Sequence, residues 1–286
     1  MILITGVSSS PGYKIALKLS ESYDVIGIYN EHPVAKINSI KYDLTKDPEK
    51  IVEAYKPEVL VHTAAIGNVD LCEENRDFCY NINVNTSRRL LVKAKQINAK
   101  IIYISTNYVF DGKKGMYKEN DTPAPINYYG LTKLLSENIA LSLGGTVVRI
   151  AGVYGTGYGR VNFGKYIVDK LSKNEKIDAV KDQFLSPTLN TQIGESVKKI
   201  LEKDFNGIIH IAGPRLSRYD FALKICQAFG FDSALVSPVS INSFKFKAPR
   251  PIDSSLDNTL GEKITGIKLS DFNKSIEIFK GEYYAI

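Results

Sequence analysis

Short apolar runs alternate with helical patterns along the first 150 residues of this 286-residue chain. Apolar runs occupy residues 1–5, 25–29, 59–62, 101–105 and 146–150, and helical patterns lie at 15–20, 51–55, 78–96 and 129–142. Continuous apolar strands are buried on both faces, which requires a parallel sheet with helices on each side. The sequence therefore predicts an α/β protein with a Rossmann-type doubly wound parallel sheet.

The alternation loosens after Gly155, where a glycine-rich GTGYGR turn precedes less regular helical and strand patterns. This change predicts a smaller C-terminal α/β domain whose segments interleave with the main sheet. We expect residues 1–150, plus roughly 176–206, in the Rossmann domain. Roughly 151–175 and 207–286 are expected in the second domain.

Composition indicates a protein that works in solution. The formal net charge of +6 comes from dispersed lysines, which favours an ordinary solvated surface over a nucleic-acid groove but suits an anionic substrate. The first residues do not resemble a signal peptide, and no apolar run approaches the roughly 18 residues of a membrane span. We expect a cytoplasmic protein with no nucleic-acid or membrane partner.

The three cysteines show no C-x-x-C pattern. If Cys72 and Cys79 share one helix, a rise of about 1.5 Å per residue separates them by roughly 10 Å, too far for a disulfide. We therefore expect reduced thiols. The three histidines have no metal-like spacing to one another or to cysteine, so no metal site is predicted.

The turn after the first apolar run, TGVSSSPGY, carries a candidate nucleotide site. Its outer glycines allow a sharp turn and close approach to a pyrophosphate, and proline suits the first turn of the following helix. Serine replaces the usual middle glycine, and an ordinary glycine turn is the alternative interpretation. The predicted cofactor contacts are Gly6, Ser9, Ser10, Pro11 and Gly12.

The end of the second apolar run leaves the choice between NADPH and NADH undecided. An acid there binds the ribose hydroxyls of NAD and an arginine accommodates the phosphate of NADP. The chain instead offers Asn30 as a candidate, and no arginine precedes Arg76. Asp43 and Leu44 are candidates to contact adenine, or form a plain strand end before a helix.

Tyr129 and Lys133 lie four residues apart at the start of a helical pattern, 23 residues after Thr106. Such a set can protonate a carbonyl oxygen: the phenol donates, the ammonium stabilises the phenolate and the hydroxyl polarises the carbonyl. The spacing alone is weak, because Tyr42/Lys46 and Tyr166/Lys170 also satisfy it. Only the surrounding sequence can indicate which of the three pairs is functional.

That context is a resemblance over almost the whole chain to the extended short-chain dehydrogenase/reductase family, in its dTDP-4-dehydrorhamnose reductase branch. The STNYVFDG segment and the late R-P-x-x-S-x-L-D pattern are its most specific parts. In order, the matching segments are TGVSSSPG, HTAAIGNVDLCEEN, NINVNTSRRL, STNYVFDG, YYGLTK, VVRIAGVYG, DQFLSPT, GIIHIAG and RPIDSSLD.

The resemblance implies that the Rossmann domain binds NADPH or NADH and that the second domain holds a nucleotide-sugar. It selects Thr106, Tyr129 and Lys133 as the catalytic set, with Tyr129 as general acid and with Tyr129 and Lys133 also touching the cofactor. Further cofactor contacts are Ala64, Ala65 and Ser105, and the substrate positions are Gly67, Val69, Tyr108, Gly152 and Arg250.

The implied activity is reduction of a nucleotide-linked 4-keto-6-deoxy sugar, most specifically dTDP-4-dehydrorhamnose to dTDP-rhamnose. Two alternatives remain: an epimerase that retains NAD, and a non-catalytic regulatory subunit like that of methionine adenosyltransferase. The branch allows a homodimer. Gly152 replaces the tryptophan common in the branch and Asn107 replaces an aspartate, which predicts a different, wider sugar pocket.

Overall fold

Seven parallel strands form the central sheet of the computed structural model, which describes residues 1–285. Their spatial order is β11-β6-β5-β4-β1-β2-β3, so the winding direction reverses between β1 and β4. This is the predicted doubly wound Rossmann arrangement. The strands are β1 (Ile2–Thr5), β2 (Val25–Tyr29), β3 (Ser39–Lys41), β4 (Val59–His62), β5 (Lys100–Thr106), β6 (Thr146–Ile150) and β11 (Ile208–Ile211).

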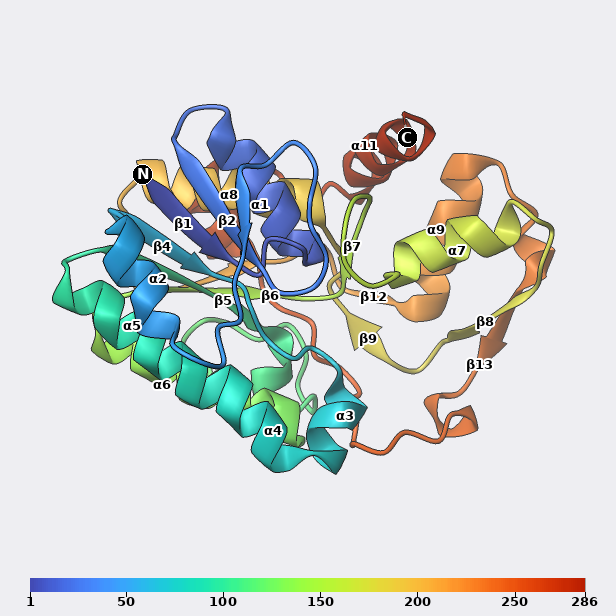
Figure 1. Ribbon diagram of the computed structural model, residues 1–286. Coiled ribbons are helices and arrows are strands. Elements are labelled where there is room, and N and C mark those ends of the chain that lie inside the picture. Colours follow the sequence, from blue (N-terminus) through green and yellow to red (C-terminus); the bar gives the residue numbers. More distant parts are fainter. Residues whose placement is uncertain (286) are drawn as a thin grey trace.

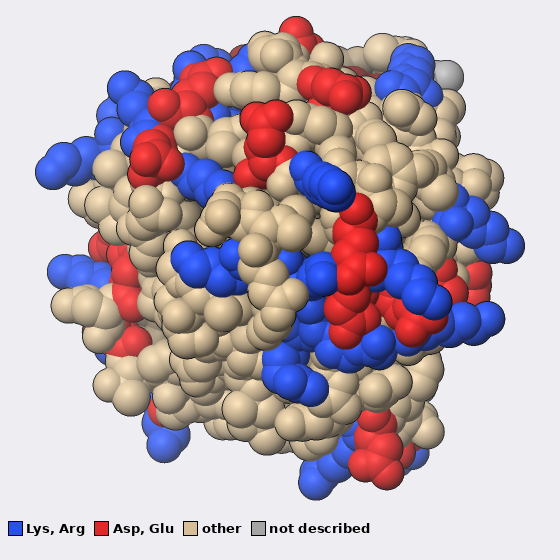
Figure 2. Space-filling model, turned by 60° about the vertical axis from the view of Figure 1, so that its left-hand side comes forward, with Lys and Arg blue, Asp and Glu red and all other residues tan. Residues whose placement is uncertain are grey.

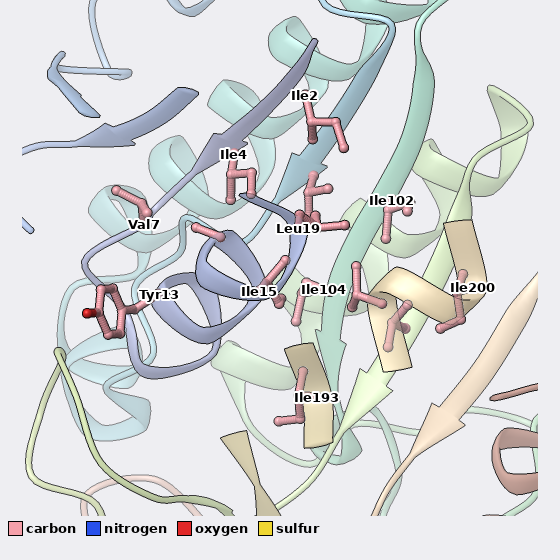
Figure 3. Packing of buried hydrophobic residues seen from close by; sticks show 14 of the residues in the cluster. Ile2, Ile4, Val7, Tyr13, Ile15, Leu19, Ile102, Ile104, Ile193 and Ile200 are labelled. Carbon is pink, nitrogen blue, oxygen red and sulfur yellow. The ribbon is translucent and has the colours of Figure 1, made fainter. Parts of the chain in front are cut away.

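Helices cover both faces of this sheet (Figure 1). On one face, α1 (Ser10–Ser20) packs against α8 (Asn190–Glu202), and Figure 3 shows Ile15 and Leu19 of α1 beside Ile193 and Ile200 of α8 over the strands. On the other face lie α2 (Pro48–Tyr55), α5 (Ser87–Gln96) and α6 (Tyr128–Ser142). Strands buried between two helical layers explain the continuous apolar runs of the sequence.

A second lobe stands beside the first and has its own core, in which Tyr154, Phe221 and Phe279 pack together (Figure 1). Three two-stranded pairs, β7–β10, β8–β13 and β9–β12, accompany its helices. Its elements are β7 (Val153–Tyr154), α7 (Phe163–Leu171), β8 (Ile177–Val180), β9 (Phe184–Leu185), β10 (Thr188–Leu189), β12 (Leu216–Ser217), α9 (Arg218–Phe229), β13 (Val236–Val239) and α11 (Phe272–Tyr284), while α10 (Thr259–Thr265) packs on β11 and α8.

The interleaving of the lobes differs from the predicted boundaries. Strand β8 pairs with β13 in the second lobe, although residues 176–206 were expected in the first. Strand β11 pairs with β6 in the large sheet, although it was expected in the second. The segments that return to the first lobe are therefore α8 to β11, residues 190–211, and α10, because their apolar faces complete the first core.

Cys72 and Cys79 form a disulfide, so the prediction of two separated thiols was wrong. The assumed single helix is interrupted at Asn75 (φ −126°, ψ 67°), between α3 (Val69–Glu74) and α4 (Arg76–Tyr80). This break brings the two Cα atoms to 5.2 Å, within the usual range for a disulfide. Both cysteines are fully buried, and Cys226 is a buried free thiol.

Removing this disulfide by Cys72→Ser/Cys79→Ser should lower the free energy of unfolding by about 2–3 kcal/mol, because it frees the unfolded chain. Urea denaturation with and without a reductant measures the effect. Reductant should destabilise the wild type and leave the double variant unchanged. Detection of three free thiols in unreduced, unfolded protein would contradict the prediction.

The surface mixes charges of both signs. Figure 2 shows Lys and Arg interspersed with Asp and Glu on the face that it draws. Several are paired across elements, such as Arg89 with Glu49 (2.6 Å) and Lys93 with Glu53 (2.5 Å), which join α5 to α2. Within residues 1–285, no helix is both long and apolar enough to cross a membrane.

Candidate active site

The predicted site residues gather at one edge of the central sheet. Gly6, Asn30, Asp43 and Ala64 follow the carboxyl ends of β1, β2, β3 and β4, and Thr106 ends β5. In parallel sheets these ends share one edge, where ligands bind near the point at which the strand order reverses. Here that point lies between β1 and β4, beside Gly6 and Ala64.

The turn after β1 is a close-packed cradle. Gly6 has φ +70°, and a Cβ placed on it would lie 2.7 Å from the backbone of Ala64. A Cβ on Gly12 would lie 2.7 Å from Ser9 Oγ, which instead accepts a hydrogen bond from Gly12 N at 3.1 Å. Ser9 is thus the N-cap of α1, which explains why serine serves in place of the usual middle glycine.

This cradle fits a dinucleotide. The amino end of α1 offers backbone N–H groups and a positive dipole end to a pyrophosphate. At the end of β5, the buried Ser105 hydroxyl has no hydrogen-bond partner among the described residues, so it is available to a ligand. The structure thus brings Gly6, Ser9, Gly12 and Ala64 together in one turn region.

The adenosine-side candidates are less closely tied to the cradle. Asp43 caps its own turn by accepting hydrogen bonds from Thr45 N (3.0 Å) and Thr45 Oγ1 (2.6 Å), as the alternative strand-end interpretation expects. In the loop after β2 that contains Asn30, Ala35 N donates to Tyr158 Oη at 2.8 Å. No sequence pattern signals this contact, which joins residues 123 positions apart.

Tyr129 stands near the start of α6, beside the end of β5. Its ring contacts that of Tyr108 edge-on, with centroids 6.0 Å apart. Burial raises the pKa of Tyr129 to about 12, while a hydrogen bond with Thr106 acts in the opposite direction. The phenol is therefore protonated at neutral pH, as a proton donor must be.

Lys133 lies one helical turn after Tyr129 and is almost completely buried. Its Nζ donates to Ile104 O at 2.8 Å and lies 4.2 Å from the centroid of the Tyr103 ring. Burial lowers the pKa of Lys133 to about 7, against the opposing effect of Glu137. A phenolate forming at Tyr129 would favour the charged ammonium, so the two groups can share the proton-transfer task.

A buried hydrogen-bonded cluster around Asn83, which no sequence pattern predicted, connects elements that carry the site. Asn83 accepts from Ile66 N at 2.7 Å and donates to Thr132 Oγ1 at 3.0 Å and to Cys79 Sγ at 3.2 Å. It thereby ties the loop of Gly67 to α6 next to Lys133. Asn83 lies in a π-helical turn (Asn81–Thr86), a departure from α-helix that the sequence pattern did not reveal.

Among the predicted substrate positions, Val69 and Arg250 lie beside the same ion pair. A Cβ on Gly67 would meet open space, and Val69 begins α3. Next to it, Asp70 pairs with Arg250 at 3.0 Å. This contact joins the first lobe to the segment between β13 and α10, so the structure brings Val69 and Arg250 to the same border.

The two departures from the family pattern have structural reasons. Gly152 has φ +50°, and a Cβ on it would lie 2.5 Å from Leu185 Cδ1, so Leu185 occupies space beside it. Asn107 is buried and donates to Ser254 Oγ (2.7 Å) and to Ser254 O (3.1 Å). A carboxylate could not make these donations, which accounts for the amide at this position.

Comparison with known proteins agrees with this geometry. Residues 1–284 match the family model described as RmlD substrate binding domain. A dTDP-4-dehydrorhamnose reductase of Aggregatibacter actinomycetemcomitans is 32% identical, covering 96% of this chain and 97% of its own. Methionine adenosyltransferase 2 subunit beta of Pongo abelii is 30% identical, covering 90% of this chain and 80% of its own.

A solved structure shows the same fold with a cofactor. The dTDP-4-dehydrorhamnose reductase of Bacillus anthracis in complex with NADP superposes with a TM-score of 0.87 at 29% identity, and each chain is 98% covered. The family match spans nearly the whole chain, beyond the nucleotide-binding half that many unrelated enzymes share. The protein therefore belongs to the RmlD substrate binding domain family, within the extended short-chain dehydrogenases/reductases.

Proposed function

We propose that this protein reduces dTDP-4-dehydrorhamnose with NADPH or NADH. The observation that carries the proposal is the complete set of Thr106, Tyr129 and Lys133 at the sheet edge, with Tyr129 protonated and Lys133 buried beside it. The relatives that bear this activity by name, and the neighbour solved with NADP, support it.

The residues have separate tasks in this reaction. Reduced nicotinamide, when bound, supplies the hydride that adds to the keto carbon. Thr106 donates a hydrogen bond to the carbonyl oxygen, which stabilises the negative charge that develops there. Tyr129 gives that oxygen its proton, and Lys133 stabilises the phenolate left behind. The glycine cradle at Gly6 and Gly12 would hold the pyrophosphate of the cofactor.

The regulatory-subunit alternative retains a specific observation in its favour, namely the 30% identity to methionine adenosyltransferase 2 subunit beta. Thr106, Tyr129 and Lys133 favour catalysis, because a protein that acts by association alone does not need a buried lysine beside a half-buried phenol. A retained-cofactor epimerase would use the same residues. It would differ in leaving the total amount of reduced cofactor unchanged.

A substrate panel separates these functions. The protein should oxidise NADPH or NADH, followed as loss of absorbance, in the presence of dTDP-4-dehydrorhamnose. UDP- and GDP-linked 4-keto sugars serve as comparison substrates, and the Tyr129→Phe variant measures non-enzymatic oxidation.

Activity with none of the sugars, together with co-purification of a methionine adenosyltransferase, would replace the proposal by the regulatory function. Interconversion of sugars without loss of reduced cofactor would replace it by the epimerase function. The cytoplasmic location and the homodimer stay predictions, and sedimentation of the purified protein tests the second.

A further inference from the structure

Arg218, the first residue of α9, carries a charge that no carboxylate balances. Its Nε donates to Gln183 Oε1 at 2.9 Å, and its guanidinium lies 5.2 Å from the centroid of the Phe163 ring. Among residues 1–285 it forms no ion pair, and its other four N–H groups make no hydrogen bond that the structure records. Four directed donors are thus available to a ligand.

The other arginines show that this is unusual for the molecule. Two of them are also shielded from solvent, with 1% and 12% of the side chain exposed, and each has a carboxylate partner: Arg149 pairs with Glu137 and Arg250 with Asp70. Arg218 is the shielded arginine without one. A partly buried cation is costly unless an anion meets it, so an external anion is the missing partner.

The surroundings of Arg218 also favour an anionic ligand. Burial lowers the pKa of its guanidinium, and the nearby Arg250 lowers it further, while Tyr108 acts in the opposite direction. Two neighbouring cations with a single carboxylate between them, Asp70, leave an excess positive charge. Such a site attracts an anion with more than one oxygen, because the guanidinium fork can bind two oxygens at once.

Arg218 is also well placed relative to the reacting group. Tyr108 lies between it and Tyr129, whose ring it contacts at 6.0 Å. Gln183 links Arg218 to the segment of Arg250, since its Nε2 donates to Pro251 O at 3.0 Å. Figure 1 places β9 and β12, which flank Gln183 and Arg218, between the large sheet and helices α7 and α9.

We propose that Arg218 binds the diphosphate of the nucleotide-sugar and is thus a substrate-binding residue of the site. The inference rests on the proposed function, because a sugar whose carbonyl lies at Tyr129 would extend its diphosphate past Tyr108 toward Arg218. Arg250 is already neutralised by Asp70, so Arg218 supplies the direct contact.

Calorimetric titration with dTDP tests this without any turnover. Arg218→Gln should weaken dTDP binding by about 10-fold or more, the loss expected for charge-assisted hydrogen bonds. Its affinity for thymidine, which lacks phosphate, should stay as in the wild type. Unchanged affinity for NADPH would show that the lost anion contact is not with a phosphate of the cofactor.

Arg215→Gln is the matched control, because Arg215 lies three residues earlier but pairs with Asp253 at 2.7 Å and stacks on Phe184. It should bind dTDP as the wild type does. Arg218→Lys, which keeps the charge but not the fork, should bind with intermediate affinity and provides a second variant if Arg218→Gln does not fold. Wild-type dTDP affinity should also fall with added salt more steeply than thymidine affinity.

Equal dTDP affinity in Arg218→Gln and the wild type would overturn the inference, as would a parallel loss of thymidine or NADPH binding. Failure of the proposed function is a separate result. In that case no keto sugar would be reduced, while dTDP would still bind in a manner that depends on Arg218.

Discussion

Replacing Tyr129 by phenylalanine is expected to lower kcat for keto-sugar reduction by about 10³-fold, within the range of general-acid contributions. The variant keeps the ring and its contact with Tyr108 but removes the proton that the carbonyl oxygen needs. Affinity for NADPH should change little, because the glycine cradle at Gly6 and Gly12 is untouched. Stopped-flow measurement of cofactor oxidation and fluorescence titration of NADPH separate the two effects.

Tyr128→Phe is the control for this experiment. Tyr128 is adjacent in sequence, but its ring packs against the Arg76 guanidinium, 5.2 Å from the ring centroid. Its removal should leave turnover near that of the wild type. Near-native kcat in Tyr129→Phe, or a loss in Tyr128→Phe of the same size, would remove Tyr129 from the general-acid role.

Replacing Arg149 by methionine should lower the free energy of unfolding by about 3–5 kcal/mol, the usual cost of leaving one member of a buried ion pair alone. Arg149 on β6 binds Glu137 on α6 through Nε (3.0 Å) and Nη2 (2.8 Å), and both side chains are 1% exposed. The variant would leave the Glu137 carboxylate without its counter-charge between sheet and helix. Urea denaturation measures the loss.

Arg89→Met provides a matched comparison. Arg89 also binds a glutamate through two nitrogens, at 2.6 and 2.7 Å to Glu49, but this pair lies at the surface between α5 and α2. Its loss should cost less than about 1 kcal/mol, because solvent screens exposed charges. Similar losses in Arg149→Met and Arg89→Met would show that the buried pair is not a significant source of stability.

Much of the site could be predicted because its chemistry depends on local spacing. Tyr129 and Lys133 share a helix face by virtue of four-residue separation, and Ser9 caps α1 three residues before Gly12. The continuous apolar runs required a parallel sheet, and parallel strands bring the residues at their carboxyl ends to one edge. These relations hold whatever the distant parts of the chain do.

Other features required contacts between distant residues. The Cys72–Cys79 disulfide depends on a helix break at Asn75, which no glycine or proline announces. Strands β8 and β11 lie in opposite lobes because each pairs with a strand far away in the sequence: β8 pairs with β13, and β11 pairs with β6. A buried π-turn places Asn83 against Ile66 and Thr132, 17 and 49 residues away.

The sequence alone determined the sheet type, the helix bearing Tyr129 and Lys133 and the glycine cradle, because these follow from the periodicity of apolar residues and from local turn chemistry. Only the tertiary structure decided which charges are balanced. Arg149, Arg250 and Arg218 look alike in the sequence, yet two meet carboxylates 12 and 180 residues away, and the third does not. Burial and long-range proximity set the cost of a charge, and neither is encoded in local spacing.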